Sequence, residues 1–179
     1  MRFTGSKEES MKIYDSIKRR LNPIRFWKSK GLVIGDFCEV YASANFGSEP
    51  YLVRLGDHVR VNAGVNFVTH DGGVWVLRYL KDDFKDIDLF GRIRIGTNVH
   101  IGTNAIIMPG VTIGNNCIIG CGAIVTHDIP DNSIAAGVPA RVIENIEEYC
   151  QKHEDAFLHT KAMNAKDKRK YLESFYSSR

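Results

Sequence analysis

Two histidines of the chain lie in the same tetrapeptide, Val-Thr-His-Asp, and are the first candidates for chemistry. His70 belongs to the copy at residues 68–71, and His127 belongs to the copy at residues 125–128. A neutral imidazole accepts protons well near neutral pH, because the unperturbed pKa of histidine is about 6.5. Which of the two acts as a base depends on the elements that surround each copy.

A six-residue repeat surrounds both histidines. Large aliphatic residues recur at this spacing, and a small residue follows each of the first five by four positions. The aliphatic positions are Ile95, Ile101, Ile107, Ile113, Ile119 and Val125, and the small ones are Val99, Ala105, Val111, Cys117 and Ala123. The same pattern starts at Ile34 and again at Leu55, so that it covers most of residues 34–130.

The repeat predicts short strands rather than helices. In a helix, residues six apart are rotated by about 240° and form no apolar stripe. In an extended chain, positions i, i+4 and i+6 face the same side, and a glycine after the aliphatic residue permits a tight corner. We therefore expect the chain to wrap into a solenoid whose turns bury each other's aliphatic side chains.

The repeat is interrupted at two places. The first interruption lengthens the spacing after Phe46 from six residues to nine, and the second places twenty-eight residues between Phe67 and Ile95. The second contains a loop over residues 72–92, and His70 lies at its root. A long loop that leaves a rigid repeat is typical of a binding or catalytic site, which favours His70 as the base.

The cysteines and histidines do not predict a metal site. No two cysteines form a Cys-x-x-Cys pair, and the histidines lack the local spacing of metal ligands. Cys38 and Cys117 occupy the small position of the repeat, which valine or alanine fills elsewhere, and are expected in the core. We expect no metal and reduced thiols.

The resemblance to a known family rests on two stretches. Residues 95–120 read IGTNVHIGTNAIIMPGVTIGNNCIIG, and residues 128–143 read DIPDNSIAAGVPARVI. Over residues 32–146 the chain resembles the hexapeptide-repeat acyltransferases, closest to the maltose and galactoside O-acetyltransferase branch and related polysaccharide O-acetyltransferases. The resemblance implies an all-β left-handed parallel β-helix, acetyl-CoA as the donor, and a homotrimer whose active sites lie between neighbouring chains.

The resemblance assigns the acceptor side of the site. His70 matches the general base that takes the hydroxyl proton, and Asn45 matches an asparagine that binds a sugar hydroxyl or merely forms a corner. Asp71 orients His70 or binds the acceptor, although neighbours in an extended chain point apart. Trp75 and Tyr79, in the loop, either stack on a sugar ring or pack the loop onto the coil.

The resemblance also assigns the donor side. A main-chain N–H near Thr103 is expected to stabilise the oxyanion of the tetrahedral intermediate. Cys121 matches a small residue against the pantetheine, and Thr126 matches a threonine that contacts the cofactor. His127 stands where the family has a cofactor-contacting lysine. Arg141 matches a basic residue near the phosphates, for which a guanidinium is well suited.

These assignments predict an acetyl-CoA-dependent O-acetyltransferase that acts on a sugar or polysaccharide precursor by direct transfer in a ternary complex. An N-acetyltransferase for a nucleotide-linked amino sugar is the main alternative. A non-enzymatic scaffold, or a metal-dependent trimer with histidines shared between subunits, is the alternative from another class.

Charge and hydropathy narrow the partners and the location. The formal charge of +3 is spread along the chain, so no nucleic-acid partner is expected. No apolar run approaches the roughly 18 residues of a membrane span, and the first residues lack the apolar centre of a signal peptide. These features predict a cytoplasmic protein without an integral membrane segment.

The ends of the chain differ from the repeat in composition. Residues 1–31 are expected to be helical, with an amphipathic helix over 6–20 that stops before Asn22-Pro23. Residues 147–179 form a charged tail, for which we expect one or two helices that cap the coil. The alternative for the stretch after Lys166 is disorder.

Overall fold

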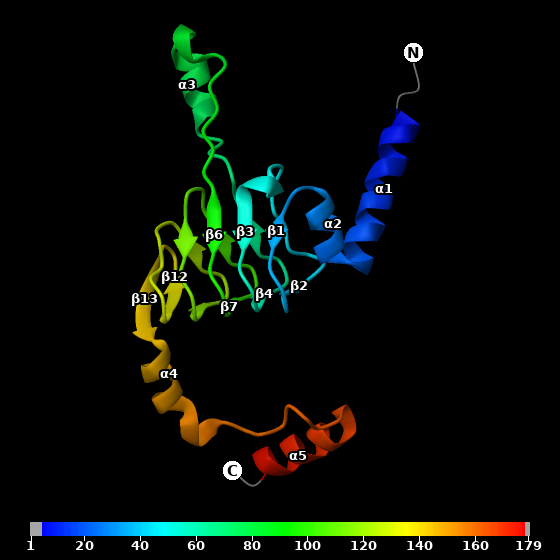
Figure 1. The fold of residues 1–179 in the computed structure, drawn as a ribbon, viewed down its shortest axis with the longest axis vertical. Helices are drawn as coiled ribbons and strands as arrows, with labels where there is room; N and C mark the ends of the chain where they lie inside the picture. Colours follow the sequence, from blue (N-terminus) through cyan, green and yellow to red (C-terminus); the bar gives the residue numbers. More distant parts are fainter. Residues whose placement is uncertain (1–4, 178–179) are drawn as a thin grey trace. The chain divides into compact units, whose positions relative to one another are not determined.

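The computed structural model describes residues 5–177 as short strands joined by turns, with helices at both ends (Figure 1). The strands are β1 (Val33–Ile34), β2 (Glu39–Val40), β3 (Val53–Leu55), β4 (Val59–Val61), β5 (Asn66–Phe67), β6 (Ile93–Ile95), β7 (Val99–Ile101), β8 (Ile106–Ile107), β9 (Thr112–Ile113), β10 (Cys117–Ile119), β11 (Ile124–Val125), β12 (Ser133–Gly137) and β13 (Ala140–Asn145). The helices are α1 (Gly5–Leu21), α2 (Pro23–Ser29), α3 (Val74–Leu80), α4 (Ile146–His153) and α5 (Ala165–Ser177), with 3-10 turns η1 (Pro50–Leu52), η2 (Asp82–Phe84) and η3 (Glu154–Ala156).

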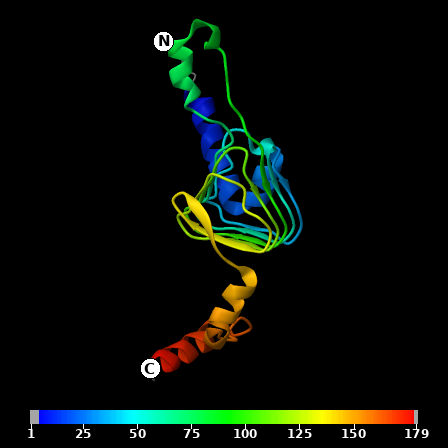
Figure 2. The same cartoon turned by 90° about the vertical axis from the view of Figure 1, so that its left-hand side faces the viewer.

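The strands form three sheets that the chain visits in turn. Sheet A has the order β1-β3-β6-β9, sheet B has the order β13-β12-β10-β7-β4-β2, and sheet C has the order β11-β8-β5. Pairing between these strands is parallel except in the hairpin of β12 and β13. The chain therefore winds as a three-sided coil whose turns stack on one another, as the view along it shows (Figure 2). The predicted strands and their solenoid winding are present.

The register of the coil contains both interruptions of the repeat. Ile95 pairs with Ile113, eighteen residues later, which is three six-residue repeats for each turn. Ile34 pairs with Leu55, twenty-one residues later, and Leu55 pairs with Ile95, forty residues later. The extra three and twenty-two residues therefore leave the coil at its corners, and the strands on either side stay paired.

The core of the coil consists of the positions that the repeat marked. All eleven large and small positions between Ile95 and Val125 are at most 3% exposed. Burial of each large aliphatic side chain contributes on the order of 1.5–3 kcal/mol to stability. At the N-terminal end of the coil, the rings of Phe46 and Phe67 stack with centroids 4.6 Å apart, and Trp27 of α2 packs edge-on against Phe46. Helix α2 thereby covers this end of the core.

The segment between β5 and β6 projects away from the coil as an arm that carries α3 (Figure 1). Val74 is buried at the start of α3. The guanidinium of Arg78 pairs with Asp88 and donates to the main-chain oxygen of Ile87 over 2.8 Å, which ties the outgoing leg of the arm to the returning one. The loop predicted over residues 72–92 is therefore an ordered excursion with its own helix.

The two ends of the chain are helical. Helix α1 spans nearly the stretch expected for it and stops before Asn22, whose side chain caps α2 by accepting the N–H of Arg25 over 2.9 Å. The chain divides into compact units at residues 1–147 and 148–179. In the second unit α5 is capped by Asn164, so the alternative of disorder is wrong for residues 167–177, and residues 178–179 lie outside the described part of the chain. The predicted division into segments 1–31, 32–146 and 147–179 stays a prediction, as does capping of the coil by the tail.

Candidate active site

His70 lies in the corner that follows sheet C, where its imidazole meets a carboxylate. The Nδ1 atom of His70 is 3.1 Å from Oε2 of Glu49, a residue in the first interruption of the repeat. The side chain of Glu49 is 16% exposed, whereas that of His70 is 47% exposed. The imidazole is thus hydrogen-bonded through Nδ1 to a largely buried carboxylate, while the rest of the ring is accessible to a ligand.

Glu49 is also held by Thr69, a residue with no exposed surface. The hydroxyl of Thr69 donates to the same Oε2 atom over 2.6 Å. This hydrogen bond is the largest cause that lowers the pKa of Glu49, with further lowering by Ser48 and His70 against the opposing effect of burial. An ionised carboxylate only accepts hydrogen bonds, so the proton of a neutral His70 lies on Nδ1 and leaves Nε2 as the free base.

A short antiparallel ladder fixes the neck of the arm on either side of His70. The N–H of Asp71 donates to Leu89, the N–H of Gly91 donates to Thr69, and His70 is bridged to Phe90. Gly91 is required here, because a Cβ atom would clash with the main-chain nitrogen of Gly110 and approach the carbonyl carbon of Pro109 to 2.7 Å. The ladder gives His70 a defined backbone position at the root of the arm.

Asp71 does not orient the imidazole. Its Oδ1 atom accepts the N–H of Gly73 over 2.8 Å, in the turn that leads into α3. Trp75 and Tyr79 are 75% and 92% exposed, so within the described chain they do not pack the arm onto the coil. The alternative that these two rings pack the loop onto the coil is therefore wrong for a single chain. Both rings are accessible to another molecule.

Asn45 lies on the outer face of sheet C, where it is bridged to Asn66. Its amide nitrogen lies 3.3 Å from Oδ1 of Asn66, and its Oδ1 atom accepts the N–H of Gly47 over 3.3 Å. Both of these hydrogen bonds are long, and Asn45 is exposed. The side chain thus stabilises the corner and still presents polar atoms to solvent.

The residues predicted for the donor side divide between two corners. The corner that precedes sheet C contains Thr103 and Cys121 in successive turns, joined by the N–H of Gly122, which donates to the oxygen of Thr103 over 2.8 Å. The turn at Thr103 is closed by a hydrogen bond from Ala105 to Gly102. The N–H of Thr103 itself has no acceptor among residues 5–177, as an oxyanion donor requires.

Thr126 and His127 lie in the corner that follows sheet C, two turns beyond His70. The hydroxyl of Thr126 is 2.8 Å from Nδ1 of His127, and both residues are exposed. Arg141 lies on β13, exposed, with one guanidinium nitrogen donating to the oxygen of Ala140 over 2.8 Å. These side chains are available to an external ligand.

The structure does not bring His70 and Thr103 together within one chain. Thr103 lies before the strands of sheet C and His70 lies after them, so the two are at opposite ends of these strands. A reaction that uses both residues requires a second chain whose corner faces that of the first. One chain therefore keeps the predicted base apart from the predicted oxyanion donor.

His100, Cys117 and Cys38 lie in structural positions. His100 lies on sheet B, 3.2 Å from the amide of Asn62, and its pKa is lowered by burial and by the charge of Arg60. Cys117 is buried and Cys38 is half-buried, and burial raises the pKa of both thiols. In the part of the chain that the structure describes, no group of three or more ligating side chains could hold a metal ion. No helix between residues 5 and 177 is long and apolar enough to cross a membrane.

Comparison with known proteins identifies the family. Residues 92–127 match the family described as bacterial transferase hexapeptide (six repeats). The chain is 46% identical over 158 residues to Protein CapG of Staphylococcus aureus, covering 87% of this chain and 90% of that protein. The chain belongs to the hexapeptide-repeat transferases, which confirms the resemblance and the prediction of an acyltransferase.

Three further proteins are similar to the chain. Galactoside O-acetyltransferase of Escherichia coli (strain K12) is 40% identical over 126 residues, which cover 69% of this chain and 59% of that enzyme. A solved galactoside acetyltransferase in complex with coenzyme A matches with a TM-score of 0.57 and 26% identity, over 83% of this chain and 86% of that one. An acetyltransferase from Vibrio cholerae, complexed with acetyl coenzyme A, shares the fold with a TM-score of 0.59 at 19% identity, over 81% and 92% of the two chains.

Glu49 is the residue of the site that sequence reasoning missed. It lies in the stretch after Phe46 where three extra residues enter the turn. The signal that points to it is a carboxylate in the interruption one turn before His70. Its contact depends on where the three residues fold, which the spacing alone does not specify.

Proposed function

We propose that the protein is an acetyl-CoA-dependent O-acetyltransferase that acts on a hydroxyl of a sugar or polysaccharide precursor. The observation that carries the proposal is the hydrogen-bonded series Thr69, Glu49 and His70 at the root of the arm. It gives an oriented neutral base with one free nitrogen. An acyltransferase that uses an alcohol acceptor needs such a base and no metal.

The proposed reaction proceeds by direct transfer. Nε2 of His70 removes the acceptor's hydroxyl proton while its oxygen forms a bond to the thioester carbonyl carbon. The negative charge on the carbonyl oxygen is stabilised by the N–H of Thr103 of a neighbouring chain. Collapse of the intermediate breaks the carbon–sulfur bond, and the CoA sulfur leaves with the proton that His70 returns. No acyl-enzyme forms.

The separation of His70 and Thr103 at opposite ends of the strands of sheet C supports a homotrimer in which these two corners of neighbouring chains face each other. In this assembly the coil is a left-handed parallel β-helix, as the repeat and the family imply. Cys121, Thr126, His127 and Arg141 would line the groove for acetyl-CoA, with the guanidinium of Arg141 near its phosphates. Because acetyl-CoA is a cytoplasmic metabolite, we propose a cytoplasmic step in polysaccharide biosynthesis.

The acceptor side would combine Asn45, Asp71 and Trp75. Asn45 offers an amide to a sugar hydroxyl, and Asp71 keeps one carboxylate oxygen free of the Gly73 hydrogen bond. The exposed ring of Trp75 suits stacking on a sugar. In the trimer, the arm of one chain would reach the site of the next.

An acetyl-transfer assay with a hydroxyl sugar and its amino analogue tests the proposal. We expect O-acetyl product, and we expect His70→Ala to lower turnover about 10²–10⁴-fold without loss of the trimer or of CoA binding. Near-normal rates in this variant would exclude His70 as the base. Turnover of the amine alone would establish an N-acetyltransferase instead.

A further inference from the structure

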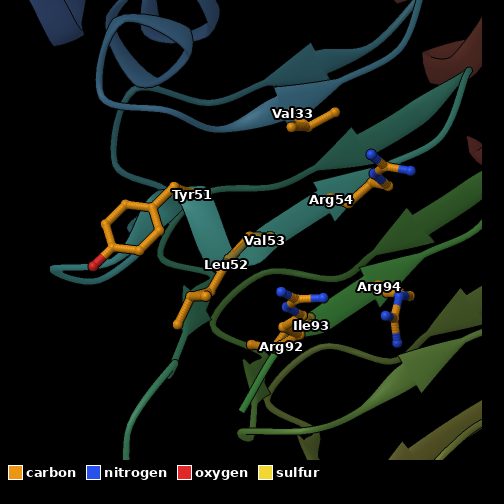
Figure 3. Close-up of a pocket in the computed structure, with 8 residues that line it drawn as sticks. All are labelled: Val33, Tyr51, Leu52, Val53, Arg54, Arg92, Ile93 and Arg94. Carbon is orange, nitrogen blue, oxygen red and sulfur yellow. The ribbon is translucent and has the colours of Figure 1, made fainter. Parts of the chain in front are cut away.

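Sheet A carries a groove lined by three arginines and no carboxylate. Its volume is about 580 Å³, which lies in the range of sites for small ligands. Arg54, Arg92 and Arg94 line it together with Tyr51 and apolar residues of β1 and β3 (Figure 3). The flanking residues of the strands are buried in the core, so these arginines project outward from the coil.

The arginines are placed side by side by the register of the coil. Arg54 of β3 pairs directly with Arg94 of β6. Adjacent strands are about 4.8 Å apart, so two guanidinium groups on the same face repel each other. Arg92 precedes Arg94 by two residues and faces the same side. The sheet therefore concentrates three positive charges within one groove.

No carboxylate neutralises this cluster within residues 5–177. Two other arginines of the coil and arm, by contrast, have a carboxylate partner: Arg60 lies 2.9 Å from Glu39, and Arg78 pairs with Asp88. Arg54, Arg92 and Arg94 have no ion pair in the described part of the chain. Since like charges held together are unfavourable, their arrangement fits an anionic ligand that is supplied from outside.

The walls of the groove continue from the segments that hold His70. Tyr51 of η1 follows Glu49 by two residues. Arg92 directly follows Gly91, whose N–H is bonded to Thr69. A ligand in the groove thus lies against the same two segments that fix the Glu49–His70 pair.

We propose that this groove binds the anionic group, a carboxylate or a phosphate, of the saccharide acceptor. The proposal rests on the proposed function and names the acceptor class as an acidic saccharide. Guanidinium groups present planar pairs of N–H donors that match both kinds of oxyanion. Tyr51, 62% exposed, offers a flat face to the sugar ring beside them.

Direct binding to the full-length His70→Ala protein tests this without turnover. The probes are glucuronic acid against glucose, galacturonic acid against galactose, and glucose 1-phosphate against glucose, each titrated by NMR. We expect the charged member of at least one pair to bind about tenfold tighter, with the preference weakened at high salt. Arg54→Gln and Arg94→Gln should each reduce that preference about tenfold. Arg60→Gln, on an equivalent outward position of sheet B, is the matched control and should leave it unchanged.

The outcomes separate the sources of the anion. Preference for a uronic acid identifies a carboxylate ligand, and preference for glucose 1-phosphate identifies a phosphate ligand. Equal affinity for charged and neutral sugars would overturn the proposal. The proposal would also be overturned if Arg94→Gln lost affinity for acetyl-CoA alone or changed its oligomeric size. Binding of the protein only to phosphatidylglycerol vesicles would overturn it as well.

Failure of the catalytic proposal gives a different result. If the wild-type protein binds the acidic sugar through Arg54 and Arg94 but acetylates no hydroxyl, the groove stands and the O-acetyltransferase assignment falls. If it acetylates neutral sugars and the arginine variants have unchanged kinetics, the groove proposal falls and the reaction stands.

Discussion

Glu49 and His70 are separated by twenty-one residues in the sequence, and their side chains meet at 3.1 Å. They lie one turn of the coil apart, and Glu49 belongs to the part of that turn that contains the three added residues. Its carboxylate contacts Nδ1 of the imidazole. The pair therefore depends on both the regular winding and its first interruption. It links a scaffold feature to the chemistry proposed for His70.

Replacement of Glu49 by Gln should lower kcat about 10–100-fold, because an amide no longer fixes the tautomer of His70. Steady-state rates with both substrates saturating measure the effect. Glu39→Gln, which removes a carboxylate paired with Arg60 on sheet B, is the control. An unchanged kcat in Glu49→Gln would contradict the role.

Thr69→Val should destabilise the fold at neutral pH by about 1–2 kcal/mol, because Glu49 loses a hydrogen bond in a largely buried site. The Thr69 hydroxyl lowers the pKa of Glu49, so the ionised carboxylate stabilises the native state above the usual carboxyl range. This stability is lost as the pH falls through the lowered pKa. In Thr69→Val the native-state pKa of Glu49 should shift toward that of the unfolded chain, so the decline with falling pH should be smaller.

Thermal unfolding between about pH 3 and 7 measures that shift, in the pH range where carboxyl groups titrate. Thr69→Ser keeps the hydroxyl and should follow the wild-type curve. Coincident curves for the valine and serine variants would show that the hydrogen bond does not affect stability.

His127→Ala should raise the KM for acetyl-CoA about 5–20-fold and change kcat by less than about threefold, because the residue is assigned to cofactor binding and not to the reacting atoms. His127→Lys introduces the residue that the family has at this position and should be close to the wild type. Steady-state kinetics with the acceptor saturating provide the measurement. A fall in kcat with unchanged KM would place His127 in the chemical step instead.

Acidification should destabilise the coil through His100. Burial, and then the charge of Arg60, lower its pKa, so the native state favours the neutral imidazole. Its contribution is complete above the unfolded pKa of about 6.5 and is lost as the pH falls through the lowered value. His100→Gln keeps a polar partner for Asn62 and should flatten the stability curve below about pH 6.5. His159→Gln, at an exposed position of the tail, should leave the curve unchanged.

The six-residue pattern predicted the coil well because its determinants are local. Each aliphatic position from Ile95 to Val125 is buried, and the corners fall between them. The root position of His70 followed from the second interruption for the same reason. These features depend only on spacing and on the alternation of an extended chain.

The contacts made by excursions were not accessible from spacing. Asp71 is adjacent to His70 yet caps the turn at Gly73, whereas Glu49 reaches the imidazole from the preceding turn. The groove of Arg54 and Arg94 likewise appears only when residues forty apart are paired. Such contacts depend on the length and path of an inserted segment, which no periodic signal encodes.

The pairing of Leu55 with Ile95 has a consequence for how such a protein changes over generations. The two residues are in the same register as Ile95 and Ile113, although the arm separates the first pair. The strand register of the coil therefore does not depend on the length of a segment inserted at one of its corners. An arm of a different length or sequence can therefore leave the same corner while the strands that flank His70 keep their pairing.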